Sequence, residues 1–173
     1  MNRSENRFSL IKPIELCHSN VFDLIGNGWM LISAEHGGKA NTMTASWGTL
    51  GFLWGRPVAT IFVRPQRFTF SLLEKCQRFS LSFLPHELRD SMRICGSISG
   101  RDTDKFKAAS LPCMHYGSVP YVGESDSVFI CKKLYSDLIS GDRFHSSEPL
   151  SNYKNCDYHK MYICEIEKIL KRK

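Results

Sequence analysis

The segment Lys39–Trp54, KANTMTASWGTLGFLW, carries the side chains best suited to hold a polar or anionic ligand. It is rich in Ser and Thr, and Gly and Ala stand between them. Hydroxyl groups donate hydrogen bonds, and small residues let a ligand approach the backbone N–H groups. The alternative is a Gly- and Thr-rich strand and turn that only builds a small barrel.

Cationic side chains occur in two further segments. Arg64 and Arg67 follow a β-branched run, and guanidinium groups match the geometry of a phosphate. A Gly/Ser loop over 96–102 carries Arg101 and leads to Lys105 at the start of a short predicted helix, where anions are favoured. Each arginine alone is more simply a solvated or ion-paired side chain. Together the three segments predict a cleft for an anion, provided that the fold brings them together.

Several kinds of catalytic site are excluded by their missing motifs. The sequence has no G-x-S-x-G, no H-E-x-x-H, no P-loop, and no G-x-G-x-x-G after a strand. Cys156, His159 and Cys164 match no standard zinc spacing and lack an evident fourth ligand, so no metal site is predicted. If the protein is an enzyme, its reactive group is therefore expected to be a cofactor.

Composition predicts one globular domain spanning residues 1–173. Hydrophobic residues make up 42% of the chain and charged residues 23%, and the length is sufficient for a real core. The net charge of +6 favours anionic partners. Because the positive charge is spread along the chain, without a basic stripe or an RNP-like aromatic signature, a small anionic ligand is favoured over nucleic acid.

The first residues and the cysteines predict a cytoplasmic protein that does not enter a membrane. The start of the chain does not resemble a secretory signal, and no apolar run is long enough to cross a bilayer. The seven cysteines are an odd number, are scattered, and include no C-x-x-C pair. Reduced thiols are therefore expected.

The elements that must position these residues are mostly short strands. A Gly37-Gly38 turn joins a strand over 29–34 to the Lys39–Trp54 segment as a hairpin. Pro13 with the next few residues could dock as an edge strand, and 111–124 reads as a partly extended connection. Further strands are predicted over 58–63, 78–84, 127–139 and 158–170, and short helices over 68–76, 86–95 and 103–109. The fold class is therefore mainly β with short helices, a small closed antiparallel sheet, since a doubly wound sheet needs a full helix after each strand.

Four motifs resemble the flavin reductase-like family, most closely its flavoredoxin-type branch. They are NTMTASWG at Asn41–Gly48, VRPQRFT at Val63–Thr69, CGSISGRDTDKF at Cys95–Phe106 and YHKMYICEI at Tyr158–Ile166. The resemblance implies an FMN-binding split β-barrel of Greek-key-like antiparallel strands. It also implies a homodimer with the flavin near the subunit interface. The chain ends shortly after the last motif, so a tail that caps the partner subunit is expected to be absent.

The same resemblance implies a set of cofactor-binding residues. His159 is a candidate for contact with flavin or nicotinamide, or for a brace within the barrel. The residues implied to hold FMN are Thr42, Met43, Thr44, Ala45, Ser46 and Trp47 around the ring and tail, Arg64, Gln66, Arg67 and Thr69 near the phosphate, and Ser99, Gly100, Arg101 and Lys105 closing the site.

Two functions follow as hypotheses. The first is an FMN flavoprotein, an oxidoreductase that passes electrons from NAD(P)H or a redox protein donor to a flavin or another acceptor. An electron carrier without a substrate of its own is a variant of this hypothesis. The alternative is a non-catalytic module of the same barrel that binds a nucleotide or nucleic acid. The resemblance to the family implies no role for the cysteines.

Overall fold

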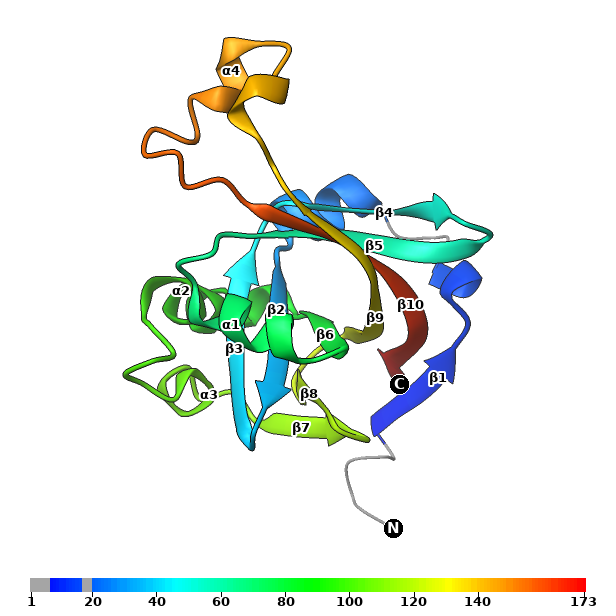
Figure 1. The fold of residues 1–173 in the computed structure, drawn as a ribbon. Coiled ribbons are helices and arrows are strands. Elements are labelled where there is room, and N and C mark those ends of the chain that lie inside the picture. The colour runs from blue at the N-terminus through cyan, green and yellow to red at the C-terminus, as the bar shows by residue number, and fades with distance from the viewer. Residues whose placement is uncertain (1–6, 17–19) are drawn as a thin grey trace.

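The computed structural model describes residues 7–16 and 20–173. Cys17 therefore lies outside the described residues. The chain forms an antiparallel sheet in the order β3-β2-β6-β9-β10-β5-β4, with β1 added to β10 (Figure 1). The strands of this sheet are β1 (Phe8–Ile11), β2 (Met30–His36), β3 (Lys39–Ala45), β4 (Gly48–Leu53), β5 (Arg56–Val63), β6 (Arg78–Phe83), β9 (Ser127–Leu138) and β10 (Lys160–Arg172).

The two ends of the sheet are joined by a connection of only two residues. β3 and β4 stand at opposite ends of the strand order, yet only Ser46 and Trp47 separate them in sequence. Because consecutive Cα atoms are about 3.8 Å apart, the sheet must curl until these ends meet. This confirms the predicted antiparallel barrel, mainly β with short helices.

Local sequence explains the hairpin and the most regular strand. Gly37 and Gly38 both have positive φ, 60° and 73°, as the tight turn between β2 and β3 requires. In β6, Phe79 and Leu81 alternate with serines as predicted, and they are buried in the barrel core. Ser80 is buried as well, because its hydroxyl donates a 2.6 Å hydrogen bond to a backbone carbonyl of a small hairpin that covers this strand.

That small hairpin corrects one prediction. Residues 111–124, expected to be a partly extended connection, contain β7 (Cys113–Tyr116) and β8 (Val119–Val122), which pair antiparallel. Gly117, with φ of 57°, makes the turn between them. Several Pro and Gly residues obscured the pattern, and Pro120 is tolerated because β8 belongs to a two-stranded sheet.

The predicted edge strand is shifted toward the N-terminus. Pro13–Leu16 forms a 3-10 helix, and the edge strand is β1, which precedes it and pairs with the end of β10. Proline lacks an N–H group and fixes φ, so Pro13 is poorly suited to continue a strand ladder.

Short helices cover one side of the barrel (Figure 1). α1 (Phe68–Lys75) packs on β2 and β3, and α2 (Arg89–Ser97), which follows a 3-10 turn at His86–Leu88, packs on β3. α3 (Lys105–Ala108) is shorter than the predicted helix, and the Asp104 side chain caps it by accepting from the Lys107 N–H. Under α2 and α3 lies a second apolar core that includes Leu31, Met92 and Phe106.

A segment between β9 and β10 projects from the barrel (Figure 1). It holds a 3-10 turn at Gly141–Arg143 and α4 (Ser147–Leu150), and the aromatic rings of Phe144, Tyr153 and Tyr158 pack together within it. A five-residue π-helix, Asp23–Asn27, precedes β2. Within residues 7–16 and 20–173, none of the helices has the length and apolar character needed to cross a membrane.

Candidate functional site

A cavity of about 620 Å³ opens where the β3–β4 junction meets the loop after β5 and the loop after α2. Its volume lies within the range of about 300–1,000 Å³ that is typical of small-molecule sites. The predicted site residues that line it are Met43, Thr44, Ala45, Ser46, Trp47, Arg64, Gln66, Arg67, Ser99, Gly100, Arg101, Lys105 and His159. The three segments that the sequence marked as anion-binding thus meet in one place.

Two predicted site residues are not among the lining. Thr42 is fully buried, and its hydroxyl accepts a 2.9 Å hydrogen bond from Ser33 of the neighbouring strand. Thr69 is also buried, and its hydroxyl accepts a 2.8 Å hydrogen bond from Asn41. The Thr42 hydroxyl is held by Ser33 of β2, and the first turn of α1 directs Thr69 toward Asn41 of β3. Both side chains support the site from behind and do not line it.

Four lining residues were missed, namely Phe62, Phe68, Ser97 and Ile98. Phe62 alternates in β5 with the buried Ile61 and Val63, so the period of the strand could have directed it to the other face. The other three lie inside or beside the motifs already singled out. Their position in or beside a motif, and not their residue type, could have indicated that they line the cavity.

The β3–β4 junction offers both engaged and available hydroxyl groups. The Thr44 hydroxyl donates to the Met92 carbonyl of α2 and so ties β3 to that helix. In the described part of the chain, the Ser46 hydroxyl has no hydrogen-bond partner although it lines the cavity. Ser46 is therefore the hydroxyl of this junction that is available to a ligand.

Two arginines bring positive charge without a matching carboxylate. Arg67 donates to the Gly96 carbonyl at 3.2 Å, and Arg101 donates to the Gln66 carbonyl at 3.0 Å. These bonds orient the guanidinium groups, and neither arginine is in an ion pair with any of residues 7–16 or 20–173. Their remaining N–H groups can donate to an anion.

The other two cations of the cavity are already engaged. Arg64 forms an ion pair with Asp157 and donates a 3.0 Å hydrogen bond to the Asn152 carbonyl. Lys105 is only 4% exposed, and its ammonium group donates a 2.7 Å hydrogen bond to the Cys95 carbonyl. Burial lowers the pKa of Lys105. Arg67 and Arg101 are thus the groups best placed to bind a phosphate.

Gly100 fixes the loop after α2 against β3. A Cβ atom at this position would lie 2.1 Å from the Asn41 side-chain oxygen, so only glycine fits there. The Asn41 amide group donates in turn to Thr69 of α1. One buried asparagine therefore holds the loop, the strand and the helix in register around the cavity.

His159 contributes a neutral imidazole. Burial, with the positive charges of Arg64 and Arg67, lowers its pKa to about 4, although Asp157 acts in the opposite direction. The Nδ1 atom lies 3.0 Å from the Tyr153 hydroxyl, and the ring lies 5.2 Å from that of Trp47. At neutral pH this side chain can form hydrogen bonds without adding charge.

Aromatic side chains supply the apolar part of the lining. Trp47 is 44% exposed, and Phe62 and Phe68 line the same space. Flat apolar surface beside hydroxyl groups and guanidinium groups suits a planar ring that carries an anionic tail.

A family model described as flavin reductase like domain matches residues 22–173. The chain belongs to the flavin reductase-like family. The resemblance predicted from the four motifs is therefore confirmed. A search of curated proteins found no relative.

Solved structures of the flavin reductase-like type share the fold. An FMN-binding protein from Thermus thermophilus, with bound 1-cyclohex-2-enone, is 25% identical with a TM-score of 0.63, and the match covers 82% of this chain and 68% of that one. Flavoredoxin from Methanosarcina acetivorans is 18% identical with a TM-score of 0.63, covering 82% and 67%. An NADH:FAD oxidoreductase from Streptomyces globisporus C-1027 is 15% identical with a TM-score of 0.63, covering 83% and 74%.

Within the described part of the chain, the residues considered as metal ligands lie in different environments. Among the described residues, no group of three or more His, Cys, Asp or Glu side chains is arranged to hold a metal ion. Cys164, one of the residues considered as a ligand, is fully buried in the barrel core, whereas Cys156 is exposed.

Proposed function

We propose that this protein binds FMN in the cavity at the β3–β4 junction and acts as a flavin-dependent oxidoreductase. The observation that carries the proposal is the meeting of aromatic surface with Arg67 and Arg101, two guanidinium groups without carboxylate partners. FMN combines a flat ring with a phosphate that is a dianion near neutral pH. The similar protein from Thermus thermophilus is described as FMN-binding, which supports the assignment.

The lining residues fit this cofactor by their chemistry. Arg67 and Arg101 would bind the phosphate through charge-assisted hydrogen bonds, and the Ser46 hydroxyl would donate to the polar tail. Trp47 and Phe68 would pack against the ring system. When bound, the flavin would supply hydride and electron transfer, which the side chains of this cavity do not provide by themselves.

His159 would act by hydrogen bonding rather than by charge. Its pKa of about 4 keeps the imidazole neutral at physiological pH, and Tyr153 and Trp47 hold the ring at the cavity wall. A neutral imidazole can donate to or accept from a bound ring without perturbing its charge. We assign this hydrogen-bonding role to His159 because its side chain lines the cavity.

The electron donor is proposed to be NAD(P)H or a redox protein. One similar structure, the NADH:FAD oxidoreductase, names NADH, which supports reduced nicotinamide as a donor. Reduced nicotinamide is the first donor to test, because it can be added as a pure compound.

A homodimer is proposed as the working assembly. Phe52, Leu53 and Trp54, which are consecutive at the end of β4, are 73%, 38% and 55% exposed. Such a concentration of exposed apolar side chains is typical of an interaction surface. Light scattering on the purified protein measures the mass, and a monomer at micromolar concentration would overturn the proposal.

A reducing, cytoplasmic location is proposed from the thiols. The cysteines at 76, 95, 113, 131, 156 and 164 are free. Cysteines without disulfide partners are usual in a reducing compartment.

The absorbance spectrum of the purified protein tests the cofactor. The proposal expects a yellow protein with visible flavin bands, or a colourless apoprotein that takes up added FMN in a one-to-one ratio. Anaerobic addition of NADH or NADPH should then bleach the visible band. A protein that neither contains nor takes up FMN would end this assignment.

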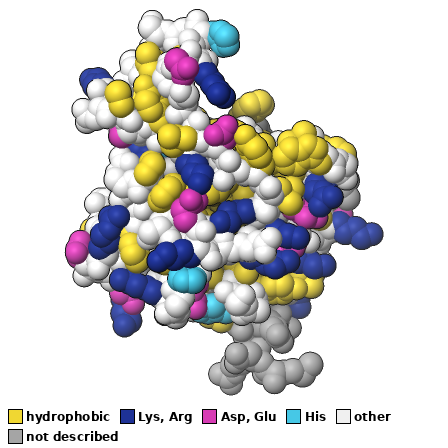
Figure 2. All heavy atoms as spheres, viewed as in Figure 1, with side chains coloured by type: hydrophobic (Ala, Val, Ile, Leu, Met, Phe, Trp, Pro, Cys, Tyr) yellow, Lys and Arg dark blue, Asp and Glu magenta, His cyan; other side chains and the backbone are white. Residues whose placement is uncertain are grey.

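The second candidate function is a barrel that binds nucleic acid without redox activity. It is favoured only by the net charge of +6. Figure 2 shows Lys and Arg side chains spread over one face with Asp and Glu among them, which is not the basic stripe typical of nucleic-acid binders. Oligonucleotide binding that weakens steeply with salt, together with no bleaching by NAD(P)H, would favour this function instead.

A further inference from the structure

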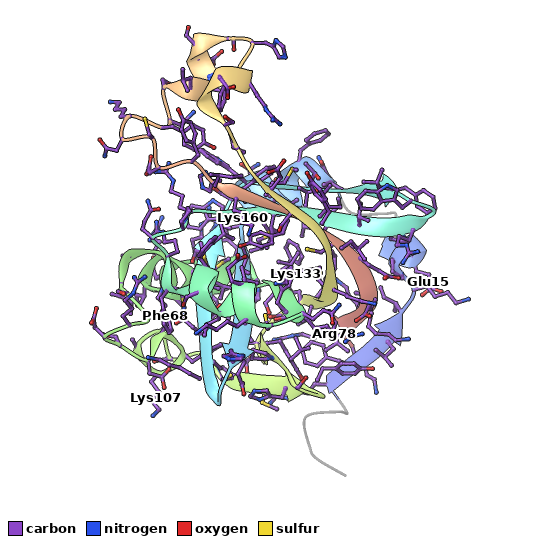
Figure 3. All side chains as sticks on the ribbon, in the orientation of Figure 1. Glu15, Phe68, Arg78, Lys107, Lys133 and Lys160 are labelled. Carbon is purple, nitrogen blue, oxygen red and sulfur yellow. The ribbon has the colours of Figure 1, made fainter. Side chains whose placement is uncertain are left out.

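His159 lies where the projecting segment returns to the barrel. It directly precedes β10, and in Figure 3 the next residue, Lys160, marks this junction. The His159 carbonyl accepts a 3.0 Å hydrogen bond from the N–H of Ile139, which directly follows β9. Because the side chain also lines the cavity, the imidazole lies between the projecting segment and the ligand space.

One nitrogen of this imidazole is held by a tyrosine of the projecting segment. The Nδ1 atom lies 3.0 Å from the hydroxyl oxygen of Tyr153, and the two ring centres are 5.5 Å apart with the rings nearly perpendicular. Tyr153 is only 8% exposed, and its ring packs on Phe144 and Tyr158. The Tyr153 hydroxyl is therefore fixed against Nδ1 of His159.

Arg64 keeps Tyr153 in this place. Its guanidinium group donates a 3.0 Å hydrogen bond to the carbonyl of Asn152, directly before Tyr153, and pairs with Asp157 further along the segment. It also lies 5.5 Å from the centre of the Tyr153 ring. Burial raises the pKa of Tyr153, and the charge of Arg64 acts in the opposite direction. The phenol thus keeps its proton, and the nearby cation makes it a better hydrogen-bond donor.

The direction of the hydrogen bond follows from the chemistry of the two groups. Burial lowers the pKa of His159 to about 4, so the ring is neutral near neutral pH and carries its proton on one nitrogen only. A phenol is a strong donor and a weak acceptor, whereas an unprotonated imidazole nitrogen is a strong acceptor. Among residues 7–16 and 20–173, the Tyr153 hydroxyl has no other hydrogen-bond partner. Nδ1 therefore accepts from Tyr153, and the imidazole proton lies on Nε2.

The Nε2–H group is then a donor available at the cavity. In the part of the chain that the structure describes, Nε2 of His159 has no hydrogen-bond partner. The Trp47 ring lies beside the imidazole, with the ring centres 5.2 Å apart, and so supplies apolar surface next to this donor. A flat ring with a carbonyl oxygen or an unprotonated nitrogen at its edge matches this combination.

We propose that Tyr153 is a positioning residue, which holds His159 in the Nε2–H tautomer so that Nε2 donates a hydrogen bond to an acceptor atom of the flavin ring. The inference rests on the proposed function for the identity of this ligand, whereas the tautomer is a property of the protein alone. A hydrogen bond strengthens as its acceptor becomes more negative. The bond from Nε2 therefore favours the reduced flavin, which is richer in electrons, over the oxidised flavin.

¹⁵N NMR of protein labelled at histidine tests the tautomer without any cofactor. At neutral pH the His159 signals, assigned by their loss in His159→Gln, are expected to show a protonated Nε2 and an unprotonated, hydrogen-bonded Nδ1. Tyr153→Phe removes only the hydroxyl and should move the Nδ1 signal toward that of a nitrogen without a hydrogen bond. A proton on Nδ1 in the unmodified protein would overturn the proposal, as would an Nδ1 signal that does not move in Tyr153→Phe.

Tyr158→Phe is the matched control for Tyr153→Phe. Tyr158 packs in the same aromatic cluster, with its ring centre 5.0 Å from that of Tyr153, but it makes no hydrogen bond to His159 and does not line the cavity. Loss of its hydroxyl should leave the Nδ1 signal in place. A shift of equal size in both variants would mean that the cluster acts only by packing and would refute the role of the Tyr153 hydroxyl.

Reductive titration of the FMN-loaded protein tests the hydrogen bond to the ligand. The ratio of the affinities for reduced and oxidised FMN is the quantity to compare, because a general loosening of the site would weaken both alike. In Tyr153→Phe this ratio should fall at least about twofold, seen as a lower midpoint potential, and in Tyr158→Phe it should not change. An unchanged ratio in Tyr153→Phe would refute the contact with the flavin. If FMN does not bind the unmodified protein, the proposed function has failed, and the NMR result still decides the tautomer.

Discussion

Arg64, which directly follows β5, is ion-paired with Asp157 from the segment that leads into β10. The same carboxylate accepts a 3.2 Å hydrogen bond from the Gln66 side chain. Asp157 thus ties the projecting segment to the cavity wall. It also compensates the charge of the arginine that sequence alone had placed beside a phosphate. The net positive charge offered to a ligand therefore comes from Arg67 and Arg101.

Replacement of Arg67 tests this division of roles. Arg67→Ala should weaken FMN binding by about 1–3 kcal/mol, since a charge-assisted hydrogen bond to the phosphate is lost. Fluorescence titration of the apoprotein measures the dissociation constant. Arg93→Ala is the control, because Arg93 pairs with Asp90 on α2 and lies outside the cavity. An affinity that does not change in Arg67→Ala would refute the assignment.

Removal of the Asp157 charge should have two opposite effects. In Asp157→Asn, Arg64 loses its partner, so the free energy of unfolding should fall by about 1 kcal/mol. The cavity gains one uncompensated positive charge, so FMN should bind a few-fold more tightly at low salt. Denaturant unfolding and fluorescence titration measure the two quantities.

Glu165→Gln is the matched control for Asp157→Asn, because it breaks the Arg56–Glu165 ion pair away from the cavity. It should lower stability by a similar amount and leave FMN affinity unchanged. Weaker FMN binding in Asp157→Asn would show that the carboxylate holds the site together more than it neutralises it.

Thr42 is expected to support the fold and not to bind the cofactor. Thr42→Val leaves the buried Ser33 hydroxyl without its partner, so unfolding should become easier by about 1–3 kcal/mol. FMN affinity of the folded variant should be unchanged. The double variant Ser33→Ala/Thr42→Val removes both hydroxyl groups and should recover part of the lost stability. A large loss of FMN affinity in Thr42→Val would restore Thr42 to the site.

Gly100→Ala should strain the loop after α2. The added methyl group would overlap the Asn41 side chain, so stability should fall by about 1–3 kcal/mol. Gly51→Ala is the comparison, because a Cβ atom there meets nothing within 4 Å, and its effect should stay within about 0.5 kcal/mol. Thermal unfolding measures both. Equal stability of the two variants would mean that Asn41 moves aside freely.

His159 should make the protein less stable in mild acid. Its pKa is about 4 in the fold against an ordinary value of 6.5, so between these pH values the unfolded chain binds a proton that the folded chain does not. Stability from this residue is complete above pH 6.5 and is lost as the pH falls toward 4. His159→Gln should reduce the difference in unfolding free energy between pH 7 and pH 4.5 by on the order of 1 kcal/mol. An unchanged pH profile would contradict the neutral state of the ring.

Much of the fold could be predicted because its signals are local. The paired glycines at 37 and 38 specify a turn through their positive φ, and the alternation around Phe79 specifies a strand. The hairpin at 113–122 was missed because its turn and proline residues obscure a pattern of only four residues in each strand. Short elements carry too few residues for a period to be evident.

The site was harder to predict because partners decide what each side chain does. Nothing near Arg64 in sequence reveals that Asp157, 93 positions away, neutralises it. Thr42 and Thr44 are the same residue type in one strand, yet one bonds inward to Ser33 and the other lines the cavity. Residue type indicated an anion site, whereas tertiary pairing selected which members of the set remain available to a ligand.

Ser46 and Trp47 both line the ligand cavity and join the first strand of the sheet order to the last. A molecule that occupies the cavity therefore contacts the two residues that connect β3 to β4. By thermodynamic linkage, a ligand that binds the folded barrel and not the unfolded chain raises the free energy of unfolding. If the protein binds FMN in this cavity as proposed, cofactor binding and the stability of the fold are expected to be coupled.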